Sequence, residues 1–276
     1  MVVATSTRCV HDLFAEQAQA RPDAPAICAW DGELTYGELD VLSTELAGHL
    51  VELGVKAEDM VPLCFEKSMW TVVAMLAVLK ASGAFVPLDP DHPQNRHEEI
   101  LKQTKASLVL TSAQHVLLWA DSALEVVTVS EASLRQLLPD TGHVQPLSRP
   151  GNAAYTIFTS GSTDMPKGVV LEHQEVSTSC LGHGAAFCLT RRTRTIQFAA
   201  YTFDACIAEI VTTLVHGGCV CVPSEAERRN DIVRTIDSAN VNWAFLTPSV
   251  ACLLDPYTVL SLEVLALGGE RVDTVN

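Results

Sequence analysis

The sequence lacks the features of several common protein classes. Its longest apolar stretch, residues 70–79, is shorter than the roughly 20 residues that a membrane-spanning helix needs. No basic region followed by an apolar core opens the chain, so no secretory signal is visible. No long run of lysine or arginine occurs, and the formal net charge of −15 disfavours nucleic acid or an anionic membrane as a partner. We therefore expect a soluble cytoplasmic protein.

The nine cysteines form neither a disulfide framework nor a zinc pattern. Their number is odd, their spacing is irregular, and several lie inside apolar runs. Cys219 and Cys221 are not followed by a second Cys or His pair at zinc spacing. We expect buried thiols in a reducing compartment, and we expect no metal ligands.

Apolar sequence is plentiful enough for a sizeable core, because 48% of the 276 residues are hydrophobic and only 18% are charged. Short apolar runs alternate with segments of helical spacing. Strands are expected at residues 26–29, 61–65, 84–88, 107–111, 126–129, 153–158, 169–171, 196–198, 219–222, 241–246 and 264–267. Helices are expected at 10–20, 36–53, 69–83, 93–105, 131–138, within 174–187, 204–215 and 226–239. This alternation predicts an α/β fold with parallel or mixed sheets flanked by helices.

The most informative stretch is residues 155–168. An apolar run suited to one buried strand ends at Phe158, five small residues follow, and apolar residues resume at 169–171. The five small residues are Thr159, Ser160, Gly161, Ser162 and Thr163. Small residues let backbone N–H groups approach an anion, hydroxyls add donors, and Lys167 adds a charge. The loop is therefore a candidate phosphate cradle.

The Walker loop and an ordinary hairpin tip are two other interpretations of this stretch. The Walker pattern does not fit, because Pro166 precedes the lysine and Gly168 follows it. A hairpin tip of ordinary Gly, Ser and Thr turn composition stays open as an alternative on spacing alone.

Residues 158–168 resemble the signature loop of adenylate-forming enzymes, specifically the adenylation domains of nonribosomal peptide synthetases. Three further stretches resemble motifs of this family in the right order: residues 34–39, 79–89 and 201–209, the last in wording typical of fungal synthetases. The resemblance spans nearly the whole chain. It implies that ATP and an amino acid react to give an aminoacyl adenylate and pyrophosphate, with Mg²⁺ accompanying the ATP.

The family pattern also implies site residues. Thr159 and Lys167 would be catalytic, and the triphosphate would be held by Thr159, Ser160, Gly161, Ser162, Thr163, Lys167 and Gly168. Gly269 and Glu270 resemble the turn on the adenine side. Because a carboxylate is already ionised at neutral pH, such a site needs donors for the phosphates more than a general base.

Asp204 matches the family aspartate that pairs with the α-ammonium group of the substrate. A carboxylate facing an apolar pocket is costly unless a cation meets it, which would select amino acids. The alternative role for Asp204 is a helix N-cap. By alignment to the family pattern, the side-chain pocket would be lined by Ala205, Ala208, Phe245, Ala266 and Gly268. These small and apolar residues suggest a large apolar or aromatic amino acid.

Asp164 departs from the family pattern, which has glycine at this position. A carboxylate about 4 Å from a phosphate charge would cost on the order of 4 kcal/mol at a surface-like dielectric. If Asp164 points into solvent, as a loop-tip residue can, the penalty shrinks greatly.

Later family motifs do not occur in the 276 residues, including the glutamate that serves magnesium and the C-terminal lid domain with its lysine. We expect residues 1–276 to be a partial N-terminal subdomain that is incompetent alone, with a polar linker near 141–152. A carrier protein or a complementary C-terminal fragment would be its partner. The alternatives are a non-catalytic remnant that binds such a fragment, and an acyl-CoA synthetase-like ligase. Asp204 argues against the last, since a fatty acid has no ammonium group.

Overall fold

The structure is a computed structural model that describes residues 5–136, 146–160 and 165–271. Within these ranges the strands are β1 (Pro25–Ala29), β2 (Gly32–Thr35), β3 (Met60–Cys64), β4 (Ala84–Leu88), β5 (Leu108–Thr111), β6 (Glu125–Thr128), β7 (Ala153–Ser160), β8 (Pro166–Glu172), β9 (Arg194–Ile196), β10 (Cys219–Val222), β11 (Trp243–Leu246) and β12 (Val264–Leu267).

The helices of the described residues are α1 (Val10–Ala20), α2 (Tyr36–Glu52), α3 (Met69–Lys80), α4 (Gln94–Thr104), α5 (Glu131–Leu134), α6 (His173–Ala186), α7 (Ala205–Ile207), α8 (Thr213–Val215), α9 (Glu225–Asn230), α10 (Ile232–Ser238) and α11 (Pro248–Ala251). A 3-10 turn, η1 (Val116–Trp119), and a π-helical turn, η2 (Ala208–Thr212), complete them. None of these helices is both long and apolar enough to cross a membrane.

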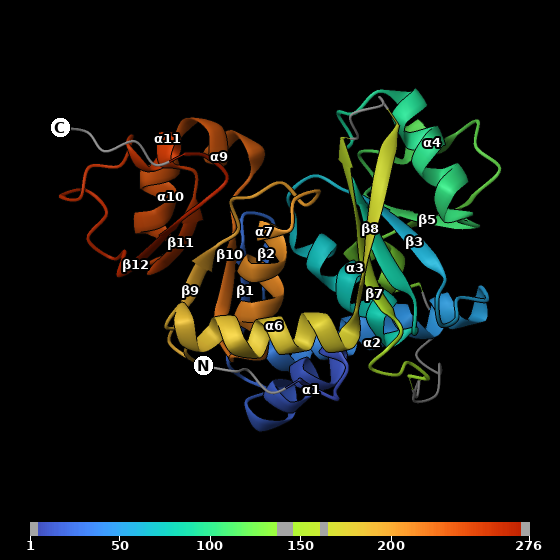
Figure 1. The fold of residues 1–276 in the computed structure, drawn as a ribbon, viewed down its shortest axis with the longest axis horizontal. Helices are drawn as coiled ribbons and strands as arrows, with labels where there is room; N and C mark the ends of the chain where they lie inside the picture. The colour runs from blue at the N-terminus through green and yellow to red at the C-terminus, as the bar shows by residue number, and fades with distance from the viewer. Residues whose placement is uncertain (1–4, 137–145, 161–164, 272–276) are drawn as a thin grey trace.

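The strands of the described residues form two six-stranded sheets. One has the order β12-β11-β9-β10-β1-β2 and the other the order β6-β5-β3-β4-β7-β8. All pairs are parallel except β1–β2 and β7–β8, which lie at one edge of each sheet. Figure 1 shows the two sheets side by side, with α3 near the middle of the molecule. The predicted α/β fold with mixed, mostly parallel sheets is confirmed.

The helix α3 explains how the sheets are joined. Ser68 caps its N-terminus by accepting a hydrogen bond from the Trp70 amide. Nearly all of its side chains are buried, which is typical of a helix covered on every side. The main core cluster contains its residues together with Ile27 of one sheet and Leu63 of the other.

Several of the sequence-based boundaries are wrong. The expected helix at 226–239 is two helices that break at Asp231, and the expected helix at 204–215 is interrupted by η2. The expected helix at 131–138 ends its described part at Leu134. Residues 137–138 and most of the expected linker, 141–145, lie outside the described residues. The short strand β2 was not expected from the sequence.

Candidate functional site

A cleft of about 420 Å³ opens where strands of both sheets end. From one sheet, Glu66 and Lys67 follow β3 and Asp89 follows β4; from the other, Tyr201 follows β9 and Glu225 follows β10. Carboxyl ends of parallel strands are where α/β sheets bind ligands, because the loops there can carry side chains without disturbing the sheet. The topology therefore makes this cleft the candidate site.

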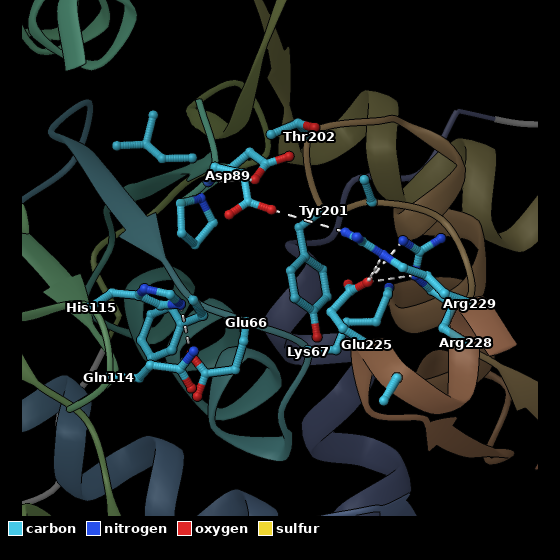
Figure 2. A pocket seen from close by; sticks show the side chains of 16 residues that line it. Glu66, Lys67, Asp89, Gln114, His115, Tyr201, Thr202, Glu225, Arg228 and Arg229 are labelled. Carbon is cyan, nitrogen blue, oxygen red and sulfur yellow. Dashed lines mark hydrogen bonds and ion pairs between the residues drawn. The ribbon is translucent and has the colours of Figure 1, made fainter. Parts of the chain in front are cut away.

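The cleft carries charges of both signs. Figure 2 shows Glu66 and His115 on one side and Arg228 and Arg229 on the other. The Glu66 carboxylate accepts a hydrogen bond from Ser112 at 2.6 Å and lies 3.2 Å from the His115 Nε2 atom. Arg228 pairs with Glu225 at 2.8 Å. Such a lining suits a ligand with both anionic and cationic groups.

A buried charged network begins at Lys67, one of the lining residues. Lys67 donates to the Gln197 side-chain oxygen at 2.6 Å and to the Ala199 carbonyl at 2.8 Å. Gln197 in turn donates to Glu209 at 3.0 Å. Burial lowers the pKa of Lys67 to about 8 and raises the pKa of Glu209 to about 7. The sequence analysis did not single out either residue.

The predicted strand–loop–strand unit at 155–168 is a hairpin of β7 and β8. These antiparallel strands pair Thr159 with Lys167 and Ser160 with Pro166. Thr159 and Lys167 are both exposed. Gly161, Ser162, Thr163 and Asp164 lie outside the described residues. The hairpin itself is therefore confirmed, whereas the phosphate role of its tip stays a prediction.

Helix α4 forms hydrogen bonds to both strands of this hairpin. Gln103 donates a hydrogen bond to the Pro166 carbonyl at 3.0 Å, and Arg96 donates to the Phe158 carbonyl at 3.4 Å. Gly168 has a packing reason to be glycine, because a Cβ there would lie 3.0 Å from the Phe158 ring. The strands that present Thr159 and Lys167 are thus fixed to the body of the sheet.

Asp204 lies just before α7 and is exposed. It is the residue at the N-cap position, but its backbone is right-handed helical and its side chain makes no capping hydrogen bond. The capping alternative is therefore wrong. Ala205 and Ala208 follow at half-buried positions of the same helical segment.

The other expected pocket residues lie at the neighbouring strand ends. Phe245 on β11 pairs in register with Ala266 on β12, and β11 is next to β9, whose chain leads to Asp204. A Cβ at Gly268 would lie 2.6 Å from the tip of the Phe245 ring, so the ring packs on the glycine. The structure brings these three residues together.

The expected adenine-side turn follows β12. Gly269 has a φ of 82°, a left-handed conformation that favours glycine. The Glu270 carboxylate accepts hydrogen bonds from the Ser249 amide at 3.1 Å and the Ser249 hydroxyl at 2.9 Å. The turn is thus tied to α11, a short helix that the sequence analysis missed. No strongly periodic pattern marks its four residues.

Among the described residues, the one group of ligand atoms close enough to hold a metal ion is Cys9, His11 and Asp12. It lies at the start of α1 and does not line the cleft. Its compactness follows partly from helix capping, since Asp12 accepts a hydrogen bond from the Cys9 amide at 3.2 Å. The described part of the cleft offers no comparable set of ligands for Mg²⁺.

Comparison with known proteins decides the family. The model of the AMP-binding enzyme family matches residues 14–274. The chain belongs to the AMP-binding enzyme family. Within it, the chain is 58% identical over 266 residues to nonribosomal peptide synthetase TES of Alternaria alternata, covering 96% of this chain and 5% of that protein. It is 44% identical to nonribosomal peptide synthetase 1 of Aspergillus fumigatus, covering 96% of this chain and 4% of that protein.

Solved structures agree with this membership of the AMP-binding family. The N-terminal subdomain of Klebsiella oxytoca NpsA in complex with 3-hydroxybenzoyl-AMSN is 25% identical with a TM-score of 0.86, over 98% of this chain and 68% of that one. The AMPPNP-bound form of the synthetase FmoA3 is 25% identical with a TM-score of 0.85, over 94% of this chain and 28% of that one. The predicted resemblance to synthetase adenylation domains is confirmed, and the chain spans about 5% of the curated relatives' length.

Proposed function

We propose that this chain forms the part of an adenylation domain that binds ATP and an amino acid, for conversion to an aminoacyl adenylate and pyrophosphate. The observation that carries the proposal is the cleft at the strand ends, because it lies between the sheet that contains the β7–β8 hairpin and the segment that leads to Asp204. Tyr201 and Thr202 of that segment line the cleft, whereas Asp204 and the described part of the hairpin do not. A site built from both sheets can bring two separate substrates together.

In this proposal the hairpin binds the triphosphate. Lys167 is exposed and makes no ion pair among the described residues, so its charge is available to a phosphate. Thr159 lies opposite it on β7 and offers a hydroxyl. Both would stabilise charge at the reacting phosphate and the leaving pyrophosphate. Ser160, Gly161, Ser162, Thr163 and Gly168 would supply further donors, and Gly269 and Glu270 would meet the base. Mg²⁺ accompanies ATP in the family, but its ligands are not apparent here.

Asp204 would bind the amino acid's ammonium group. Its exposed carboxylate carries no capping bond that would have to be broken first. Ala205, Ala208, Phe245, Ala266 and Gly268 would surround the side chain. The Phe245 ring on Gly268 provides an apolar surface, which favours a large apolar or aromatic amino acid.

Amino-acid-dependent exchange of pyrophosphate into ATP tests this function. The assay compares residues 1–276 alone with the same residues joined to the remainder of an adenylation domain from the 58% identical relative, and scans a panel of amino acids and fatty acids. Activity of the joined protein with an amino acid is expected. Exchange driven only by fatty acids would favour an acyl-CoA synthetase-like ligase, and no exchange in either form would favour a non-catalytic remnant.

The variant Asp204→Asn provides the residue-level test. Removing one partner of a desolvated charge pair costs about 2–5 kcal/mol, so we expect exchange efficiency to fall about thirtyfold or more. Asp237→Asn, at an exposed position of α10, is the matched control and should leave exchange unchanged. Equal activity of the two variants would contradict the proposed role of Asp204.

A further inference from the structure

Three buried polar side chains form a continuous relay under the cleft. Lys67 is 3% exposed, and Gln197 and Glu209 are fully buried. Lys67 donates to the Gln197 oxygen at 2.6 Å, and the Gln197 nitrogen donates to the Glu209 carboxylate at 3.0 Å. The amide of Gln197 therefore connects a cation to an anion, and its orientation is fixed because its oxygen faces a donor and its nitrogen faces acceptors.

The relay crosses from one sheet to the other. Lys67 follows β3, whereas Gln197 follows β9, and the two residues are 130 positions apart in the sequence. A second contact runs beside it: Tyr201 accepts a hydrogen bond from the Ser68 amide at 3.3 Å, and its ring lies 4.9 Å below the Lys67 nitrogen. Figure 2 shows Lys67 next to Tyr201 at the base of the cleft.

Both backbone groups of Ala199 are held by this relay. Its carbonyl accepts from Lys67 at 2.8 Å and from Gln197 at 2.7 Å, and its amide donates to the Glu209 carboxylate at 3.1 Å. Ala199 lies five residues before Asp204, on the segment that leads from β9 into the cleft. The relay thus fixes the start of the segment, residues 199–209, that contains Asp204.

The same relay fixes the end of that segment. Glu209 lies in the π-helical turn η2, directly after Ala208. A π-helical turn is locally less favourable than an α-helical one and is frequent at functional sites. Asp204 therefore lies in the sequence between Ala199 and Glu209, and one set of hydrogen bonds joins these two residues.

Stability alone is a poor reason for such a relay. Burying two charges has a large desolvation cost, and apolar side chains of similar volume stabilise a core equally well or better. Resting on the function proposed above, we propose that Lys67, Gln197 and Glu209 are positioning residues that hold Asp204 and Ala208 for the amino acid, while ATP binding by the hairpin does not depend on them.

The test compares Lys67→Met, Glu209→Gln and the double variant in the joined protein described above. Each single variant should raise the KM for the amino acid about tenfold and change the KM for ATP less than about twofold. The double variant, which buries no unpaired charge, should regain stability against urea but keep the raised amino-acid KM. Lys80→Met is the matched control, because Lys80 is a buried lysine whose partners all belong to α2; it should lower stability and leave both KM values unchanged.

Recovery of both stability and amino-acid KM in the double variant would overturn the proposal, since the relay would then be structural only. Hydrogen exchange on the 276-residue chain keeps the inference separate from the proposed function. If the unmodified protein activates no amino acid, the proposed function is wrong. Hydrogen exchange of the backbone amides of residues 199–204 then tests the relay independently. These amides should exchange at least about tenfold faster in the double variant than in Lys80→Met, and equal exchange would refute the positioning role.

Discussion

Replacing His173 by asparagine should make the protein less sensitive to mild acid. His173 is fully buried at the start of α6. Its Nδ1 atom accepts a hydrogen bond from the Val10 amide at 3.2 Å, and its ring meets the edge of the His11 ring at a centroid distance of 5.2 Å. Protonation would place a second donor against the Val10 amide. Asparagine can accept the same hydrogen bond but does not titrate.

The magnitude follows from the pKa of the buried ring. Burial, reinforced by His11, lowers the pKa of His173 from 6.5 to about 4. The unfolded chain therefore binds more protons between these values, so the contribution is fully present above pH 6.5 and is lost as the pH falls toward 4. At about 1.4 kcal/mol per pKa unit, the part lost between pH 7 and pH 5 is about 2 kcal/mol.

Urea unfolding of the 276-residue chain at pH 7 and pH 5 measures this contribution. The free energy of unfolding should fall about 2 kcal/mol more in the unmodified chain than in His173→Asn. Glu209 has a raised pKa and opposes this trend, but it is present in both proteins and cancels in the difference. His183→Asn, an exposed position on the same helix, should behave like the unmodified chain. An equal loss in His173→Asn would refute the reasoning.

Three further predictions concern stability and ATP binding. Lys80→Met should lower the free energy of unfolding by about 3 kcal/mol in urea titrations, because it leaves the oxygens that Lys80 binds at 2.7–2.9 Å on α2 without their donor; a loss below about 1 kcal/mol would argue against this. Gly184→Ala should cost about 2 kcal/mol in the same assay, because its Cβ would lie 1.4 Å from the His216 ring, and an unchanged midpoint would contradict the packing. Asp164→Gly should tighten ATP binding by calorimetry in any form of the protein that binds ATP, whereas unchanged or weaker affinity would count against charge repulsion.

Local signals in the sequence predicted most of the fold. Thr35 followed by Glu38 predicts a capping box, and the structure has both of its hydrogen bonds. The expected helix at 93–105 and the strand at 84–88 agree with α4 and β4 to within one residue at each end. These elements are encoded within a few residues of their own ends, so reading them needs no knowledge of the tertiary structure.

The buried relay could not be predicted in the same way. Lys67 lies between Glu66 and Ser68, a polar context that is typical of a surface turn. Glu209 lies in the π-helical turn η2, and the groups that bind its carboxylate, the Gln197 side chain and the Ala199 amide, come from the chain after β9. Its partner Gln197 is 130 residues from Lys67, so the contact depends on how the two sheets pack.

The four family motifs divide by what they contact. Tyr36, in the first, is fully buried, and its hydroxyl oxygen lies 2.9 Å from the Leu214 carbonyl and 2.7 Å from the Gly218 carbonyl, which ties α2 to the turn before β10. Lys80, in the second, ties α3 to α2. Asp89, at the end of the second motif, and Tyr201 and Thr202, in the fourth, line the cleft, whereas no described residue of the hairpin does. Tyr36 and Lys80 therefore act on the packing of α2, and substitution of either should lower the free energy of unfolding and leave the KM values for both substrates unchanged.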